Sequence, residues 1–289
     1  QTIAYLSSML IIFLVGLKDD LLGGAGPYEK LFMQILAVVI MFDFCDLRIF
    51  SVSSKELQFY SCLDLAIVVF LMLIVINSFN FIDGINGLSG MIGLVSNLSF
   101  GCYTNDSSFA LISFSMVGAI AGFLTLNFTK GKVFMGDTGA MLIGFGTAVG
   151  AFRFVNMKSD PIAFNGDIGF RLMLVFVLLI IPVLDLIRVT LIRFFHGKSL
   201  FVGDRNHIHH KIKDLGFKDT QVVSILMAFN LLMFVVAFKT NEKWPYSWCF
   251  ILPIIFALCH TVLTFLNGKR RSEKYKFRDV FLKDTLGLH

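Results

Sequence analysis

The chain has 289 residues, of which 56% are hydrophobic and 16% charged, and its mean hydropathy is +0.78. No soluble domain of this size needs so much apolar surface, so the composition excludes a soluble globular protein and predicts a polytopic membrane protein. The net charge of +5 is informative through its distribution, because Lys and Arg positions set membrane orientation, and five scattered cysteines without a CxxC pair indicate neither a disulfide framework nor a zinc site.

Apolar segments of membrane length recur along the whole chain, and we expect about nine spans in an all-α, polytopic transmembrane helical bundle. The predicted spans lie near residues 2–17, 30–43, 63–79, 86–103, 109–126, 138–155, 169–193, 221–239 and 247–266. The chain begins with Gln1 rather than Met and enters an apolar run almost at once. We therefore expect an N-terminal portion of the protein to precede it.

The loops between these spans alternate in character. One set comprises residues 18–29, 80–86, 127–137 and 194–220 together with the tail from Asn267, and the other comprises 44–62, 104–108, 156–168 and 240–246. The first set and the adjoining helix ends hold most of the 25 Lys and Arg. Because positively charged loops stay on the cytoplasmic side, we expect the first set to be cytoplasmic.

The stretch from Asn80 to Gly87 reads NFIDGING and places a short polar loop between two apolar spans. Such a loop cannot face lipid, because its backbone groups need hydrogen-bond partners. A carboxylate such as Asp83 at the edge of a bilayer is costly and usually marks a pathway or a site. The structural alternative is an ordinary hairpin, capped by Asn80 or Asp83 and turned by the glycines.

Two more loops of the first set carry acidic residues. Asp19 and Asp20 follow the first span, and Asp137 precedes the sixth. Adjacent acids are commonly just solvated, and Asp137 with Thr138 can also start a helix. Carboxylates from three loops would repel one another at one membrane face unless a divalent cation lay between them, and oxygen ligands favour Mg²⁺ or Mn²⁺ over zinc.

The last loop of the first set runs from Asp204 to Lys211 and holds three histidines within four residues. Neither a cysteine nor a further histidine nearby completes a zinc site, so these imidazoles suit an anionic ligand better. Mg²⁺ with cationic side chains is typical of a diphosphate site, and its membrane location suggests one lipid and one water-soluble substrate. The sequence has no Walker-type loop. Asp185 and Arg188, inside the seventh span, are interpreted as a structural ion pair.

These motifs together resemble the polyprenyl-phosphate N-acetylhexosamine-1-phosphate transferases of glycosyltransferase family 4, which include the phospho-N-acetylmuramoyl-pentapeptide transferase. The matching motifs are Gly16 to Asp20, Asn80 to Gly87, Val133 to Gly139, and His207 to His210 after Asp204-Arg205-Asn206. The resemblance runs to about Phe217. It implies that a polyprenyl phosphate attacks the sugar-linked phosphate of a UDP-sugar and releases UMP, with Mg²⁺ or Mn²⁺ as cofactor.

The resemblance also assigns residues to roles. The catalytic residues it implies are Asp19, Asp20, Asp83, His209 and His210. The substrate-binding residues it implies are Lys30, Gly84, Ile85, Asn86, Asn127, Phe134, Arg205 and His207. The metal-binding residues it implies are Asn80 and Asp137. Phe134 would stack on uracil, and Lys30 would lie on the side of the lipid phosphate.

The His-Ile-His-His order and the Asp185–Arg188 pair resemble the hexosamine branch of the family, whereas the pentapeptide branch has three successive histidines. We therefore expect an enzyme that starts cell-envelope glycan assembly. Its expected partners are a UDP-N-acetylhexosamine, a polyprenyl phosphate and the membrane, with a homodimer left open and no nucleic acid. The pentapeptide transferase, a membrane transporter and an inactive scaffold remain the alternatives.

The resemblance finally implies an organisation and a location. Residues 1–266 would form the transmembrane catalytic domain, and residues 267–289 a basic cytoplasmic tail. The location implied is the bacterial plasma membrane, with the active site and the C-terminus in the cytoplasm. Members of the family carry further helices before the first span, which this chain is expected to lack.

Overall fold

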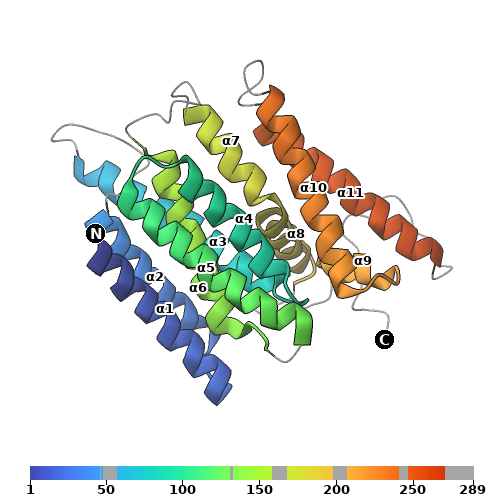
Figure 1. Ribbon diagram of the computed structural model, residues 1–289, viewed down its shortest axis with the longest axis horizontal. Coiled ribbons are helices and arrows are strands. Elements are labelled where there is room, and N and C mark those ends of the chain that lie inside the picture. The colour runs from blue at the N-terminus through green and yellow to red at the C-terminus, as the bar shows by residue number, and fades with distance from the viewer. Residues whose placement is uncertain are drawn as a thin grey trace.

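The computed structural model describes residues 1–45, 47, 57–130, 133–157, 168–197, 207–240 and 247–270, and within them every regular element is an α-helix (Figure 1). The helices are α1 (Thr2–Leu22), α2 (Pro27–Cys45), α3 (Leu57–Ile82), α4 (Leu88–Tyr103), α5 (Ser107–Lys130), α6 (Gly136–Val155), α7 (Ile168–Leu178), α8 (Ile180–Phe195), α9 (Ile208–Asp214), α10 (Asp219–Thr240) and α11 (Trp248–Arg270). The predicted all-α fold class is confirmed.

Six of the described helices are long and apolar enough to cross a membrane, and a seventh span results if α7 and α8 are one bent span. The chain is therefore a multi-pass membrane protein, but the predicted count of nine spans is not confirmed. The two segments that account for the difference are α2, which carries Glu29, Lys30 and Asp43, and α4, which has 16 residues. A helix of 16 residues is shorter than a typical membrane span.

Helix α6 forms the centre of the bundle and packs against α1, α3 and α4. In its membrane-length segment 67% of the residues are buried, against 22–39% in the other spans. Its glycines let neighbouring backbones come close, because a Cβ at Gly144 would lie 2.9 Å from the Cα of Ile76 in α3. The core helix is thus specified by small residues as well as by apolar ones.

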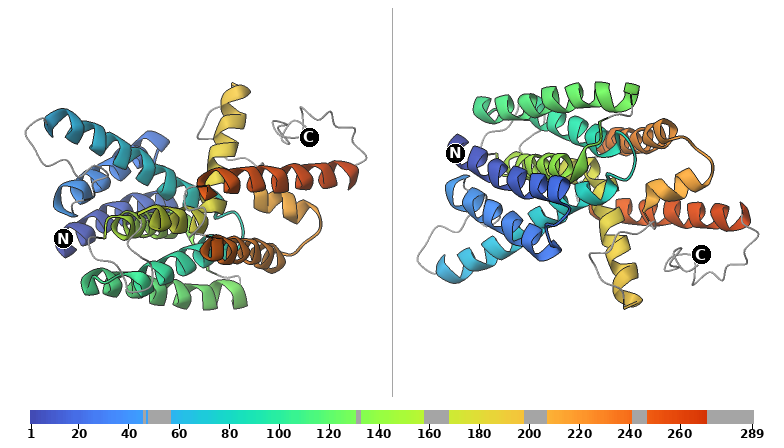
Figure 2. Two further views of the ribbon diagram at one scale, coloured as in Figure 1. Left: turned by 90° about the horizontal axis from the view of Figure 1, so that it is seen from above. Right: turned by 90° about the horizontal axis from the view of Figure 1, so that it is seen from below.

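Helices α7 and α8 meet at an angle of 69° at Leu179. Pro182 lies in the first turn of α8, where a proline is tolerated because the N–H groups there have no partner within the helix. Figure 2 shows α8 projecting away from the other helices. Despite the bend, α8 packs against α3.

The two ends of the bundle each hold a pocket, and the two pockets are lined by different residues. A pocket of about 280 Å³ at one end is lined by residues that include Cys45, Asp106, Arg153 and Asn156. Arg153 there pairs with Asp106 at 2.5 Å. The loop between α3 and α4, the end of α5 and the start of α6 meet at the other end, around a larger pocket.

Candidate active site

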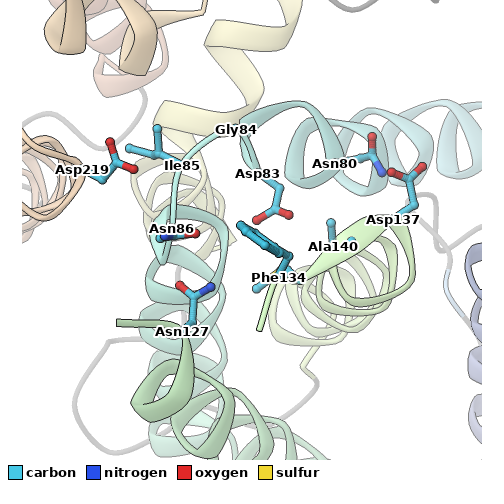
Figure 3. Close-up of a pocket in the computed structure, with 12 residues that line it drawn as sticks. Asn80, Asp83, Gly84, Ile85, Asn86, Asn127, Phe134, Asp137, Ala140 and Asp219 are labelled. Carbon is cyan, nitrogen blue, oxygen red and sulfur yellow. The ribbon is translucent and has the colours of Figure 1, made fainter. Parts of the chain in front are cut away.

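The larger pocket has a volume of about 390 Å³ and collects most of the residues that the sequence motifs singled out (Figure 3). The predicted residues that line it are Asn80, Asp83, Gly84, Ile85, Asn86, Asn127, Phe134 and Asp137. They come from the α3–α4 corner, the end of α5 and the start of α6. Figure 3 places Asn80 and Asp137 on one side of the pocket and Ile85 and Asn86 on the other.

The α3–α4 corner is a tight turn that holds its polar side chains against the pocket. The N–H of Asp83 donates to the carbonyl of Asn80, and Gly87 adopts a left-handed backbone with φ of 85°. A Cβ at Gly87 would collide with the ring of Phe128 in α5, so both the backbone angle and the packing require glycine there.

Asp83 is half-buried at the edge of the pocket. Burial, together with the negative charges of Asp137 and Asp20, raises the pKa of its carboxyl group to about 7. The side chain therefore exchanges its proton near neutral pH, which is the range that a general acid or base uses.

Asp19, Asp20 and Asp137 form an acidic cluster in which one oxygen atom from each lies within 4.8 Å of the others. Two of them come from the end of α1 and the third from the start of α6. The Lys30 ammonium group pairs with Asp19 at 2.7 Å and also with Asp137, so it joins both sides of the cluster. The two motifs that supply the carboxylates lie more than a hundred residues apart in the sequence but meet here.

Asp20 caps the N-terminus of α6 from another helix. Its carboxylate accepts hydrogen bonds from the backbone N–H groups of Asp137 and Thr138, at 2.9 and 3.0 Å, and from the hydroxyl group of Thr138 at 2.5 Å. Gly16 allows this approach, because a Cβ there would lie 2.5 Å from the Cα of Thr138. The cap orients the helix start that carries Asp137.

The opposite side of the pocket is built from amides and an aromatic ring. Asn127 is 3% exposed, and its Nδ2 donates to the carbonyl of Val133 at 2.8 Å. The Oδ1 of the same side chain is buried without a hydrogen-bond partner among the described residues. Phe134 is 76% exposed although it lines the pocket. A planar ligand with an N–H donor would use both features.

The histidine segment lies beneath the α3–α4 corner. His207 hydrogen-bonds to the carboxylate of Asp185 at 2.8 Å and stacks on the rings of Phe81 and His209. His209 has no exposed surface, and its Nε2 faces Gly84 so closely that a Cβ there would collide with it. Burial, with the neighbouring His210 as a second cause, lowers the pKa of His209 to about 3, so its ring is neutral at physiological pH.

The sequence profile described as Glycosyl transferase family 4 matches residues 2–155 of the chain. The chain belongs to this family. The matched segment contains the acidic cluster, the α3–α4 corner and the start of α6.

Curated relatives of this family 4 chain include the decaprenyl-phosphate N-acetylglucosaminephosphotransferase of Mycobacterium tuberculosis (strain CDC 1551 / Oshkosh). That protein is 32% identical over 167 residues, which cover 53% of this chain and 41% of the relative. The undecaprenyl-phosphate alpha-N-acetylglucosaminyl 1-phosphate transferase of Escherichia coli (strain K12) is 30% identical over 190 residues, which cover 63% of this chain and 50% of the relative. The matched segments thus span half or less of the length of these relatives.

Not every predicted site residue of this family 4 chain lines the pocket. The pocket lining does not include Lys30, Asp19 and Asp20, which contact the start of α6 from outside the pocket. The three histidines lie under the α3–α4 corner. Their predicted contacts with substrate remain predictions. Arg205 lies outside the described residues.

Two features of the site were not predicted. Asp185 accepts hydrogen bonds from His207 and from the N–H of Ile208, so it ties α8 to α9, a wider role than the expected ion pair with Arg188. Asp219, in the first turn of α10, lines the pocket. A single acid at a helix start is common for capping reasons alone, so nothing in the sequence pattern distinguished Asp219.

Proposed function

We propose that the protein transfers N-acetylhexosamine-1-phosphate from a UDP-sugar to a polyprenyl phosphate and releases UMP, as the first step of a glycan assembly. One observation carries the proposal. A pocket at one end of a membrane-spanning bundle adjoins, at Asp137, an acidic cluster with a lysine, and it is lined on the other side by amides and an exposed aromatic ring. Membership of glycosyl transferase family 4 and the names of the curated relatives support it.

The acidic cluster suits a divalent cation. Asp19, Asp20 and Asp137 offer three carboxylate oxygens within reach of one ion, and such hard ligands match Mg²⁺ or Mn²⁺. Lys30 now neutralises part of that negative charge through its pairs with Asp19 and Asp137. When bound, the metal would neutralise charge on the diphosphate. Asn80, beside Asp137 in the same pocket, offers a further amide oxygen.

The reaction requires an oxygen of the polyprenyl phosphate to attack the phosphorus atom that carries the sugar. That attack breaks the bond to the bridging oxygen, and the electron pair leaves with UMP. Phosphoryl transfer depends on in-line positioning and on neutralising the leaving group, more than on covalent help from the protein. Lys30, in the first turn of α2, would hold the attacking phosphate, and Asn127 and Phe134 would hold the uracil ring.

The distribution of positive charge supports a proposal for the location of the protein. The end of the bundle that holds the pocket is also the end whose loops are rich in Lys and Arg, which is the pattern of a cytoplasmic face. A UDP-sugar would enter from that side, and the lipid would enter from the bilayer. We therefore place the protein in the bacterial plasma membrane with its active site facing the cytoplasm.

The test is an exchange assay. Purified protein in detergent is incubated with polyprenyl phosphate, Mg²⁺, radiolabelled UMP and a panel of UDP-sugars, including UDP-N-acetylglucosamine and the UDP-muramoyl pentapeptide. We expect label to appear in a UDP-N-acetylhexosamine, and Asp137→Asn to abolish the exchange. Asp106→Asn, which alters a carboxylate–arginine pair at the opposite end of the bundle, is the matched control. Absence of exchange with every sugar would refute the proposal.

A further inference from the structure

Asp219 is a carboxylate of the pocket that lies apart from the acidic cluster. Figure 3 shows it beside Ile85 on the side of the pocket opposite Asp137. On the Asp219 side, the labelled polar neighbours are the amides of Asn86 and Asn127. A carboxylate among amides and an apolar side chain is a hydrogen-bond acceptor in a setting otherwise suited to a neutral polar ligand.

The α9–α10 corner holds Asp219 in this position. Gly216 takes a left-handed backbone with φ of 97°, and its N–H donates to the carbonyl of Lys213 at 2.8 Å. The side chain of Gln221 accepts a hydrogen bond from the N–H of Lys218 at 2.9 Å, which closes the start of α10. The turn therefore brings the end of α9 against the first turn of α10.

A lysine fixes the direction of the Asp219 carboxylate. The Lys213 ammonium group lies 2.7 Å from Oδ1 of Asp219. This pair compensates the negative charge, so a carboxylate can stand in a pocket for an anionic nucleotide without repelling it. The pair also engages one carboxylate oxygen, and Oδ2 keeps its own capacity to accept hydrogen bonds.

We propose that Asp219 accepts hydrogen bonds from the hydroxyl groups of a sugar ring of the nucleotide sugar. The proposal rests on the proposed function, since it specifies which group contacts that substrate. Each carboxylate oxygen has two lone pairs, so Oδ1 can accept one ring hydroxyl beside Lys213 while Oδ2 accepts the neighbouring one, as acidic residues do for ribose in dinucleotide sites. The uridine ribose and the hexosamine both carry such hydroxyls, and the experiment separates them.

The experiment measures binding of three probes by calorimetry: UMP, 2′-deoxy-UMP and UDP-N-acetylglucosamine. Each is titrated into the full chain in detergent, into Asp219→Ala and into the control Asp106→Asn. Loss of a hydrogen bond to a charged group weakens binding by about tenfold to a hundredfold. If the ribose is the ligand, Asp219→Ala weakens UMP and UDP-N-acetylglucosamine by that factor and weakens 2′-deoxy-UMP less, because that probe lacks one of the paired hydroxyl groups.

If the hexosamine is the ligand, Asp219→Ala weakens only UDP-N-acetylglucosamine. Either of these two patterns supports the proposal, provided that Asp106→Asn binds as the wild type does. Equal weakening of all three probes would mean a structural role for the ion pair with Lys213 and would overturn the proposal, as would unchanged binding of all three. A wild-type chain that binds none of the probes would overturn the proposed function itself, and this proposal with it.

Discussion

The raised pKa of Asp83 predicts that replacing this side chain with asparagine stabilises the metal-free protein at neutral and alkaline pH. Burial is the main cause of the raised value, and the negative charges of Asp137 and Asp20 add to it. An asparagine side chain at this position would keep the size and the hydrogen-bonding oxygen of the aspartate but carry no charge. The Asp83→Asn variant therefore isolates the cost of holding a carboxylate at this position.

The magnitude and the sign follow from linkage. The pKa of Asp83 is about 7 in the folded protein, against an ordinary value of 3.8. Well below pH 3.8 the group is protonated in both states and costs nothing. As the pH rises toward 7, the unfolded chain ionises first, so the free energy of unfolding falls by at most about 4 kcal/mol. Above pH 7 the loss stays constant.

The assay compares thermal unfolding of wild type and Asp83→Asn in detergent, with a chelator present, from pH 4 to pH 8. We expect the difference between their midpoints to grow in favour of the variant up to about pH 7. Asp106→Asn is the opposite control, because hydrogen bonds and the charge of Arg153 outweigh burial and lower the pKa of Asp106. That variant should lose stability relative to wild type only as the pH rises toward 3.8, so its midpoint difference from wild type should change little between pH 4 and pH 8.

A midpoint difference for Asp83→Asn that stays constant from pH 4 to pH 8 would refute the reasoning. It would mean that the carboxyl group titrates alike in folded and unfolded protein. Added Mg²⁺ supplies a second check. A cation held by the acidic cluster would reduce the repulsion from Asp137 and Asp20, so the stabilising effect of the variant should shrink.

Three further predictions concern the acidic cluster and the two helix caps. Asp137→Asn should lower turnover at least about a hundredfold with little change in the unfolding midpoint, and near-normal turnover at limiting Mg²⁺ would contradict its role as a ligand. Asp20→Ala should lower the free energy of unfolding by about 1 kcal/mol, because it removes the cap of α6, and Asp20→Asn should recover most of that loss. Equal thermal-unfolding midpoints for wild type and both variants would exclude the cap. Asp185→Ala should lower the free energy of unfolding by about 3 kcal/mol, because it leaves His207 and the start of α9 without their buried hydrogen-bond acceptor. A loss below about 0.5 kcal/mol, as is typical of surface substitutions, would argue against that contact.

The sequence predicted the helical class and the gathering of the polar motifs, because both depend on local patterns. Apolar runs of membrane length and the alternation of loops are visible residue by residue. The motifs around Asp83, Asn127 and Asp137 follow every second predicted span. Because successive spans cross the membrane in opposite directions, these motifs were expected at the same end of the bundle. The number of spans was harder to predict, since the charges in α2 and the shortness of α4 leave them ambiguous.

The contacts between distant residues could not be predicted in the same way. Asp20 and Thr138 are separated by more than a hundred positions, and no spacing rule shows that a side chain from one helix will cap another. The same holds for the bond between Asp185 and His207. Adjacent acids resemble solvated surface residues in a sequence, and they become a cluster only through the close packing of α1 on α6 that Gly16 permits.

In both helix caps, a carboxylate on one helix binds the first residues of another helix, so each cap links the site to the packing of the bundle. Asp20 on α1 holds the start of α6, and Asp185 on α8 holds the start of α9. Each helix start carries a group predicted to act on the substrate, Asp137 in one case and the histidine segment in the other. A change in how α1 or α8 packs would therefore move these groups directly. Substrate that binds between the two helix starts should in turn stabilise the contacts of both caps, because binding to one arrangement favours that arrangement.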